Sequence, residues 1–356
     1  MNWQLIIIIV YFALTMAIGI LASRKTKSSD SFVGAGMGVF AIVCVACGQW
    51  LGGTATTGCS EYGFTSGISG WWYTIANGIG MLMMGLFFAE KYRKYGEVTI
   101  PGIIERVVGP KSRTVCSILL IFVMLAVGLS QMIAAGKLGQ SLLGMDFTLS
   151  CCIFALIFII YTMSGGVKSM AKVAVVQGVV MLLATFSIIG VLCAKNASLY
   201  GSFRGAMEHL GAEYPKELQA QTAFSFWSAL GTALFAGVGL GAMPHALTVT
   251  MTYNNHKKLK QGIIISCVIF TLVQGIMCFT GPLAFSINPN LVTRDYTTIY
   301  TATNLLPSWL GGIIFCGVFA AIQSSIAGMC MAGAAALSKD FIVDCFRPKE
   351  IGRAHV

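Results

Sequence analysis

Apolar residues occur in long, nearly charge-free stretches along this chain, separated by short polar segments. A helix needs about 20 apolar residues to cross the hydrocarbon core of a bilayer. The pattern therefore predicts nine membrane-spanning helices, at residues 4–22, 39–61, 70–90, 114–136, 147–164, 173–194, 222–244, 262–284 and 308–336. Between the third and fourth of these, residues 96–112 predict a short amphipathic helix that begins near Pro101.

The composition agrees with this pattern and excludes a soluble protein. Of the 356 residues, 56% are hydrophobic and only 10% are charged, whereas about 25% are charged in a typical soluble protein. Most of the 12 cysteines fall inside apolar runs, where cysteine usually serves as a small packing residue. The spacing Cys44-Val-Ala-Cys47 lies within a predicted span without the βαβ context of a redox motif, so we interpret it as packing.

The excess of basic residues is explained by topology. The net charge is +10, and most of the 23 Lys and Arg residues lie in loops that follow the odd-numbered spans. Because basic loops stay in the cytoplasm, the N-terminus is predicted outside and the C-terminal end inside, in a multi-pass protein of the cell membrane. This placement of the charge argues against nucleic-acid binding.

Catalytic chemistry has little support in the sequence. No carboxylate lies in the middle of a predicted span, and Glu61 stands at the outer end of the second. The histidines have no metal-ligand partners at suitable spacing, and acid, base and metal ligands do not converge. A membrane enzyme is therefore disfavoured.

Two glycine clusters interrupt predicted spans and point to a binding site. Gly48–Gly53 lies in the second span and Gly237–Gly241 in the seventh. Glycine destabilises a helix interior by about 1 kcal/mol relative to alanine, and paired interruptions in two halves of a chain are typical of transporter sites. Both clusters are predicted to be unwound, although close helix packing through small residues is the alternative.

The ninth span adds neutral oxygen ligands. Ala320-Ala-Ile-Gln-Ser-Ser325 places two adjacent hydroxyls one turn after backbone carbonyls. Uncharged oxygens suit Na⁺, whereas Mg²⁺ and Ca²⁺ normally need carboxylates. The alternative is that both serines bond back to carbonyls of their own helix.

Several segments, in order, resemble the sodium:solute symporter family of proline-, pantothenate- and choline-type transporters. They are Tyr161-Thr-Met-Ser-Gly-Gly166, Gln177, Met243-Pro-His245, Ala321-Ile-Gln-Ser-Ser325 and Lys339-Asp340-Phe, and the likeness runs from Asp30 to Asp340. The resemblance implies an all-α polytopic membrane protein with a leucine-transporter-like inverted repeat, five plus five core helices after a leading helix. The second repeat is incomplete, so we expect a C-terminally truncated chain.

This reading divides the chain into five parts. They are a leading helix and cytoplasmic loop at 1–30, a first five-helix repeat at 31–195, an extracellular loop at 196–221, a partial second repeat of three helices at 222–349, and a tail at 350–356 that is expected to be non-native.

The resemblance also implies which residues bind the ion. Its sodium site would use the backbone carbonyls of Gly48, Leu51 and Ala321 with the hydroxyls of Ser324 and Ser325. Ala174 stands where some members carry an aspartate that assists a second cation, which puts a second sodium in doubt.

The solute is expected between the two interrupted helices near the middle of the bilayer. The predicted lining residues offer amides, a hydroxyl and aromatic faces but no fixed charge: Gln49, Trp50, Thr54, Gln131, Trp227 and Phe235.

The predicted function is a Na⁺-coupled secondary symporter that imports a small organic solute by alternating access. The alternative is a transporter-like input domain of a membrane histidine kinase. Coupling to H⁺ rather than Na⁺ also stays open at this point.

Overall fold

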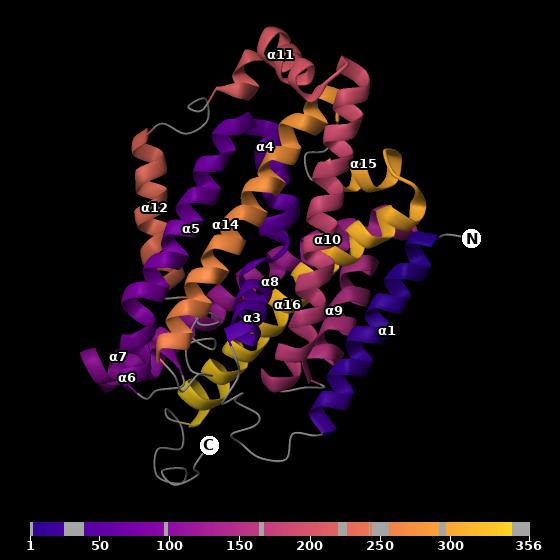
Figure 1. The fold of residues 1–356 in the computed structure, drawn as a ribbon. Coiled ribbons are helices and arrows are strands. Elements are labelled where there is room, and N and C mark those ends of the chain that lie inside the picture. Colours follow the sequence, from indigo (N-terminus) through magenta and orange to yellow (C-terminus); the bar gives the residue numbers. More distant parts are fainter. Residues whose placement is uncertain are drawn as a thin grey trace.

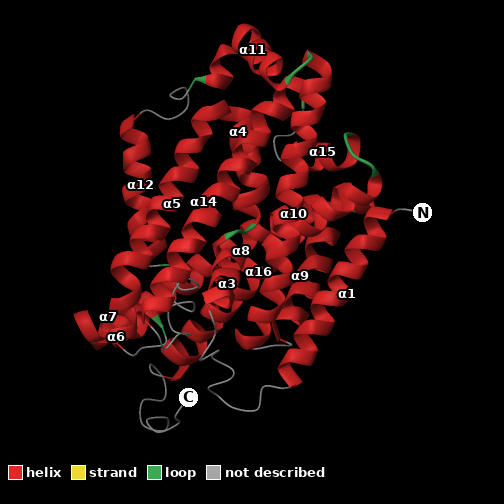
Figure 2. Cartoon of the chain, in the orientation of Figure 1, coloured by secondary structure: helices red, strands yellow, loops and turns green. Residues whose placement is uncertain are grey.

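Helices make up nearly all of the described part of the chain, and no strand occurs in that part (Figure 2). The structure is a computed structural model that describes residues 3–24, 39–95, 99–163, 167–219, 226–241, 243, 256–291 and 297–343. Five of its helical segments are long and apolar enough to cross a membrane by themselves: Trp3–Leu21, Pro110–Leu143, Lys172–Tyr200, Lys257–Ile287 and Ser308–Ile342. The chain is an all-helical, multi-pass membrane protein, as the sequence predicts.

The described helices follow one another along the chain in the order below (Figure 1). The first half holds α1 (Trp3–Arg24), α3 (Val39–Trp50), η1 (Thr54–Gly58), α4 (Cys59–Ser66), η2 (Gly67–Gly70), α5 (Trp71–Met83), η3 (Met84–Phe88), α6 (Ala89–Tyr95), α7 (Ile100–Val108), α8 (Pro110–Leu143) and α9 (Phe147–Met163). The second half holds α10 (Val167–Tyr200), α11 (Phe203–Glu213), η4 (Pro215–Leu218), α12 (Phe226–Gly241), α14 (His256–Ile287), α15 (Thr297–Asn304), α16 (Ser308–Ala335) and η6 (Ala336–Val343).

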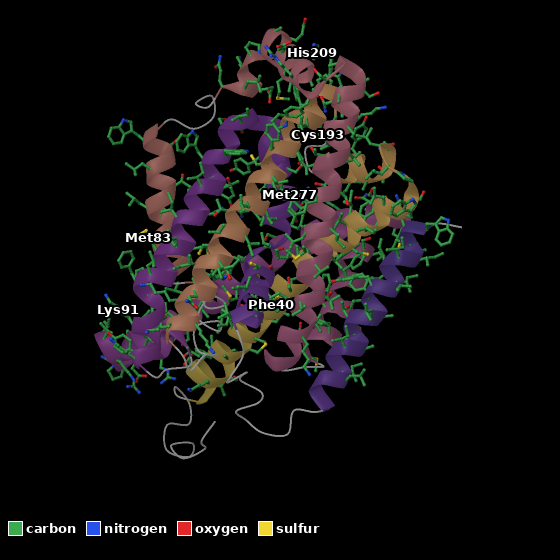
Figure 3. All side chains as sticks on the ribbon, in the orientation of Figure 1. Phe40, Met83, Lys91, Cys193, His209 and Met277 are labelled. Atoms are coloured by element: carbon green, nitrogen blue, oxygen red, sulfur yellow. The ribbon has the colours of Figure 1, made fainter. Side chains whose placement is uncertain are left out.

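Each predicted span has a helical counterpart in the described residues. The second is built from α3, η1 and α4 and the third from α5, η3 and α6, while single helices match the others. The helices α11 and α15 lie towards one end of the bundle and α6 and α7 at the other (Figure 1). His209 and Lys91 accordingly lie at opposite ends (Figure 3).

The helix α16 forms the centre of the bundle. In its most apolar stretch 89% of the residues are buried, against 22% for α1 and for α8. It packs against α10, α1, α8 and α3. Residues on α16 therefore face other helices rather than lipid, which is the position expected of a helix that carries a binding site.

Two glycines let α4 and α14 pack backbone against backbone. A Cβ atom built on Gly63 would lie 1.7 Å from the carbonyl oxygen of Cys278, and one on Gly281 would lie 2.0 Å from the amide nitrogen of Phe64. Small residues at helix interfaces permit this kind of close approach in membranes. The contact fixes the helix that follows the interruption of the second span.

The helix α10 extends beyond its predicted end at residue 194, to Tyr200. Its last turns are held on α14 by polar contacts: the Asn196 side-chain amide donates to the carbonyl of Leu283 (3.0 Å), and the Tyr200 hydroxyl donates to the carbonyl of Ser286 (2.8 Å). Bonds of this kind offset the lower apolar content of these turns.

The predicted amphipathic helix is confirmed as α7. The Thr99 side chain accepts a hydrogen bond from Gly102 N–H at its N-terminus, and Pro101 stands in the first turn. Asp340 of η6 is fully buried and its Oδ1 accepts bonds from Thr99 Oγ1 (2.8 Å) and Arg113 Nη2 (2.7 Å). A buried charge is stable only when paired, so this pair holds the end of η6 against α7 and α8.

The predicted unwinding at Gly237–Gly241 is wrong for this structure. The helix α12 continues without a break from Phe226 to Gly241. An unwound segment facing lipid would leave backbone groups without partners, and that cost exceeds the weak helix propensity of glycine.

Replacing Gly63 with alanine tests the packing of α4 on α14. The new methyl group cannot fit beside Cys278 O, so we expect a loss of about 3 kcal/mol, the upper range for forced insertion into a packed site. Fluorescence-detected size-exclusion chromatography after heating measures the melting temperature, which should fall. The matched control is Gly128→Ala, which meets no atom within 4 Å and should be neutral. An unchanged melting temperature for Gly63→Ala would contradict the contact.

Candidate functional site

The interruption of the second span is a bend between α3 and η1, and most of its backbone groups have a partner. Leu51 N–H donates to Cys47 O (2.8 Å), and Gly52 N–H donates to Trp50 O (3.1 Å). Gly53 N–H donates to the side-chain oxygen Oε1 of Gln131 on α8 (2.7 Å). Buried amides need partners of this kind. The predicted break at Gly48–Gly53 is therefore confirmed.

Glycine is required at the bend for space rather than for backbone conformation. A Cβ atom on Gly52 would lie 2.9 Å from both Gln131 Oε1 and Ser325 Oγ. A Cβ on Gly53 would lie 3.1 Å from Gln131 Oε1 and from Ala134. The bend is thus pressed between α8 and α16.

The last carbonyls of α3 accept hydrogen bonds from the two hydroxyls predicted on α16. Ser324 Oγ donates to Gly48 O (2.6 Å), and Ser325 Oγ donates to Gln49 O (3.1 Å) and, more weakly, lies 3.5 Å from Gly48 O. Ser324 Oγ also lies 3.0 Å from the carbonyl oxygen of Ala321. Bonding back within α16 and bonding across to α3 thus occur together. We call these oxygens of Gly48, Gln49, Ala321, Ser324 and Ser325 the oxygen cluster.

The oxygen cluster fits Na⁺ by its chemistry. All of its members are neutral oxygens, and the negative end of the α3 helix dipole points at them. Carbonyls at the ends of broken helices hold Na⁺ in transporters with this type of interruption. Divalent cations normally take carboxylates, and the cluster has none. The predicted residues Gly48, Ala321, Ser324 and Ser325 are therefore brought together.

Leu51, the fifth predicted ligand, is placed differently. It is buried, and its N–H closes the last turn of α3 on Cys47. Among the described residues, the two serine hydroxyls donate across to the carbonyls of Gly48 and Gln49 and not to that of Leu51. The carbonyl of Gln49 is the member of the cluster that the sequence did not indicate.

Ala174 lies directly beside the oxygen cluster. A Cβ atom on Gly48 would be 3.6 Å from Ala174 Cβ and 3.5 Å from Ser324 Cβ. Tyr161 and Gln177 line the same small cavity of about 10 Å³. The side chain of Ala174 is a methyl group, which adds no charged oxygen beside the cluster. That this chain lacks a second sodium site stays a prediction.

A cavity of about 160 Å³ opens beside the cluster, and we call it the solute pocket. Its walls come from the bend and from α5, α8, α14 and α16: Gln49, Trp50, Gly52, Thr54, Ala55, Tyr73, Asn77, Met81, Val127, Gln131, Met243, Phe270, Gln274, Ser325 and Met329. Trp50 Nε1 and Gln274 Oε1 are buried polar atoms without a hydrogen-bond partner among the described residues. They are a donor and an acceptor with capacity for a solute.

Four of the six predicted lining residues meet in this pocket, and two do not. Trp227 is 76% exposed and Phe235 82% exposed on α12. That helix packs on α5, and both aromatic side chains face away from the bundle. Their prediction as lining residues is wrong here because it assumed that α12 was broken and central.

Two residues of the solute pocket that the sequence analysis did not name, Asn77 and Gln274, could have been recognised from their sequence context. Asn77 and Gln274 are uncharged polar residues inside apolar spans, and such residues usually face a bundle interior or a cavity. Tyr73, Asn77 and Met81 are spaced by four, so they share one face of α5.

The packing role predicted for Cys47 is supported by its position. It is buried in the main apolar core, and its Sγ donates to Ser266 O at 3.8 Å. Several other predicted elements lie outside the described residues, namely Asp30, Gly165–Gly166, Pro244-His245 and the tail at 350–356.

Comparison with known proteins identifies the class. The profile of the sodium:solute symporter family matches residues 32–353. The chain belongs to the sodium:solute symporter family. It is 24% identical over 356 residues to a sodium/proline symporter of Staphylococcus aureus, covering 96% of this chain and 68% of the relative. The sodium/proline symporter of strain NCTC 8325 / PS 47 is 24% identical over 371 residues, covering 99% and 71%.

The fold is also that of a solved symporter. The chain matches the substrate-bound, outward-open structure of a Na⁺-coupled sialic acid symporter with a TM-score of 0.83, over 97% of this chain and 74% of that one. The sequence identity is 17%. At this identity the match establishes the fold of the described helices.

Near-isosteric changes in the solute pocket test its assignment. Gln274→Met and Trp50→Phe each remove one unpartnered polar atom, and a neutral hydrogen bond contributes about 0.5–1.5 kcal/mol. We expect the KM for the transported solute to rise roughly 2- to 10-fold with little change in protein level, measured by radiolabelled uptake.

The controls for this test are Trp227→Phe and Phe235→Leu. Both residues are exposed on α12, so KM should stay within about twofold. A larger rise in KM for the α12 variants than for the pocket variants would contradict the placement of the solute pocket.

Proposed function

We propose that this chain imports a small organic solute together with Na⁺ by alternating access, with Na⁺ bound at the oxygen cluster and the solute in the adjacent pocket. Membership in the sodium:solute symporter family supports Na⁺ coupling. The observation that carries the site is the convergence of Ser324 and Ser325 of α16 on the carbonyls that end α3. We also propose the carbonyl of Leu51 as a further ligand of the ion.

Coupling follows from the sharing of one segment by the two sites. The Gln49 carbonyl belongs to the oxygen cluster, while its side chain and that of Trp50 line the solute pocket. An ion that fixes the carbonyls of residues 48 and 49 also fixes the two side chains that contact the solute. The solute then binds a segment that is already ordered, so each ligand raises the affinity for the other.

The orientation in the membrane follows from charge. We propose an extracellular N-terminus, a cytoplasmic end at α7 and η6, and a location in the cell membrane, because most basic residues lie in the segments that follow the odd-numbered predicted spans, the segment with α7 among them. In this orientation α11, which lies at the end of the bundle opposite α6 and α7, is extracellular (Figure 1).

The sensor-domain alternative has no support from the family profile or the relatives. A proton-coupled mechanism would need an ionisable group at the site. The oxygen cluster contains no carboxylate, so we propose Na⁺ as the coupling ion.

Removing both hydroxyls tests the sodium assignment. In proteoliposomes, Ser324→Ala with Ser325→Ala should abolish Na⁺-stimulated uptake, because both cross-links from α16 to α3 are lost. The matched control is Ser266→Ala, a buried serine whose hydroxyl bonds within its own helix to Gly262 O, and its uptake should remain Na⁺-stimulated.

Two results would contradict this proposal. One is unchanged sodium dependence in a properly folded double variant. The other is equal uptake by wild-type protein under a proton gradient alone.

A further inference from the structure

Polar side chains from three helices meet at Gln323 of α16, the residue directly before the two serines of the oxygen cluster. The Gln323 side-chain oxygen Oε1 accepts hydrogen bonds from the Tyr11 hydroxyl of α1 (2.9 Å) and from the Gln177 side-chain amide of α10 (3.2 Å). Only 5%, 1% and 0% of Tyr11, Gln177 and Gln323 is exposed, so water does not satisfy these groups. We call the three residues the Gln323 network. They belong neither to the oxygen cluster nor to the solute pocket.

The leading helix α1 presents Tyr11 from its buried face. Tyr11 and Thr15 are one turn apart and both are buried. Thr15 bonds within its own helix to Phe12 O (3.1 Å), whereas the Tyr11 hydroxyl crosses to α16. The Phe12 ring packs edge to face on Phe319 of α16, one turn before Gln323, with 5.4 Å between the ring centroids. The helix α1 therefore holds α16 through an aromatic contact and a hydrogen bond.

Holding Gln323 fixes the direction in which the serines point. Successive residues of a helix are about 100° apart around its axis, so Gln323 meets α1 and α10 while Ser324 meets the end of α3. Ser324 Oγ lies 2.6 Å from Gly48 O, and a rotation of α16 would lengthen this distance. The same rotation would take Gln323 away from Tyr11 and Gln177, in an interior where no water replaces the lost bonds. The network therefore favours one rotation of α16.

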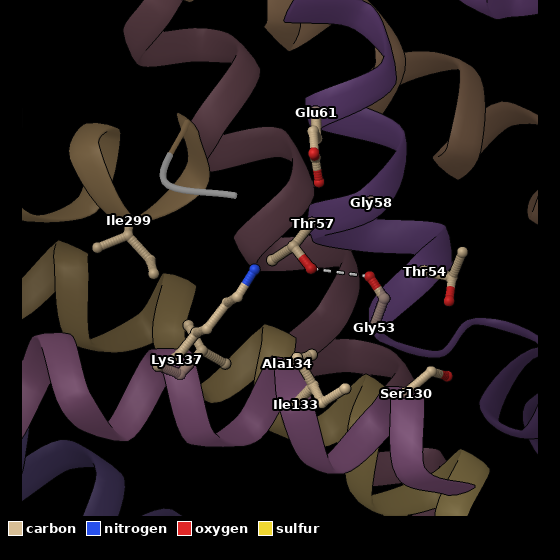
Figure 4. Close-up of a pocket in the computed structure, with 11 residues that line it drawn as sticks. Gly53, Thr54, Thr57, Gly58, Glu61, Ser130, Ile133, Ala134, Lys137 and Ile299 are labelled. Carbon is tan, nitrogen blue, oxygen red and sulfur yellow. Dashed lines mark hydrogen bonds between the residues drawn. The ribbon is translucent and has the colours of Figure 1, made fainter. Parts of the chain in front are cut away.

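The bend itself orders only its later part. After the break, the Thr57 hydroxyl of η1 donates to Gly53 O (2.9 Å) within the same segment (Figure 4). The carbonyls of Gly48 and Gln49 instead accept from the serine hydroxyls of α16. The geometry of these oxygens thus depends on where α16 is held.

The hydrogen bonding of the network argues against a purely stabilising role. Gln323 Nε2 is a buried donor without a hydrogen-bond partner among the described residues. Leaving such a group unsatisfied costs more free energy than a typical buried hydrogen bond contributes, and an aliphatic side chain at this position would leave no such donor. The best-attested use of a buried polar group among packed helices is to fix their register.

We propose that Tyr11, Gln177 and Gln323 are positioning residues for the sodium site, so that the leading helix α1 helps to set the affinity for Na⁺. The network holds α16 in the rotation that places both serine hydroxyls beside the α3 carbonyls, and the ligands are arranged before the ion arrives. Preorganised ligands bind more tightly because binding then costs less ordering entropy. The inference rests on the proposed sodium site and adds residues outside that site which control its affinity.

The test measures Na⁺ binding to the purified full chain without any solute. The melting temperature is followed by fluorescence-detected size-exclusion chromatography over a series of NaCl concentrations, with KCl keeping the ionic strength constant. An ion that binds the folded state stabilises it in a concentration-dependent way. The sodium dependence of the melting temperature therefore gives a dissociation constant for Na⁺.

Tyr11→Phe and Gln323→Met each remove one polar partner at nearly constant volume. We expect the dissociation constant for Na⁺ to rise roughly 2- to 10-fold, the range for one lost neutral hydrogen bond. The matched control is Tyr200→Phe, which removes a hydroxyl that donates from α10 to Ser286 O of α14 (2.8 Å). A loss of stability alone should lower its melting temperature equally in NaCl and KCl and leave the dissociation constant unchanged.

A triple variant separates positioning from stability. Tyr11→Phe, Gln177→Met and Gln323→Met together leave no group of the network without a partner, so the melting temperature in KCl should return to the wild-type value or exceed it. The dissociation constant for Na⁺ should stay raised roughly 2- to 10-fold, because the three side chains act as one unit. A dissociation constant that returns to the wild-type value together with the melting temperature overturns the inference.

The two levels of proposal fail differently. A wild-type melting temperature that is the same in NaCl and KCl overturns the proposed sodium site, and the inference with it. A sodium-dependent rise in wild-type protein, with an unchanged dissociation constant in Tyr11→Phe and in the triple variant, overturns the role of the Gln323 network alone.

Discussion

The hydrogen bonds from Ser324 and Ser325 to the carbonyls that end α3 are the interaction on which the site depends. A helix leaves its last carbonyls without partners inside the helix, and in a membrane such groups cannot turn to water. Here Cys47 O is closed by Leu51 N–H, Trp50 O by Gly52 N–H, and the carbonyls between them by the two hydroxyls. The break is therefore stable only because α16 lies against it, and α16 is the most buried of the long helices.

The same arrangement explains why an ion and a solute can act on one another. Between Gly48 and Thr54 the chain presents carbonyls to α16, the side chains of Gln49 and Trp50 to the solute pocket, and an amide to Gln131. Any ligand that orders this short segment changes the site of the other ligand. Asp340 and its partners Arg113 and Thr99 hold the far end of η6 in place, so α16 offers a fixed surface against which α3 can be arranged.

Much of this site could be predicted from the sequence because its chemistry is local. Gly48–Gly53 marks the break through the weak helix propensity of glycine, and the adjacent Ser324 and Ser325 mark the oxygen ligands. The errors concern packing between distant helices. Whether Trp227 and Phe235 face a pocket depends on which face of α12 meets α5, and glycines alone could not indicate that α12 stays regular to Gly241. Asn77 and Gln274 carried a usable signal as polar residues inside apolar spans, but only the structure brings them to the same cavity.

Amide hydrogen exchange of the purified protein in NaCl and in KCl of equal ionic strength tests the central claim most directly. If Na⁺ bridges the end of α3 and α16, exchange should slow in NaCl at residues 51–56 and at 320–325, and Ser324→Ala with Ser325→Ala should remove the difference while α11 exchanges alike throughout. Equal exchange at the bend in the two salts, or a sodium effect that persists in the double variant, would contradict the claim that the oxygen cluster binds Na⁺.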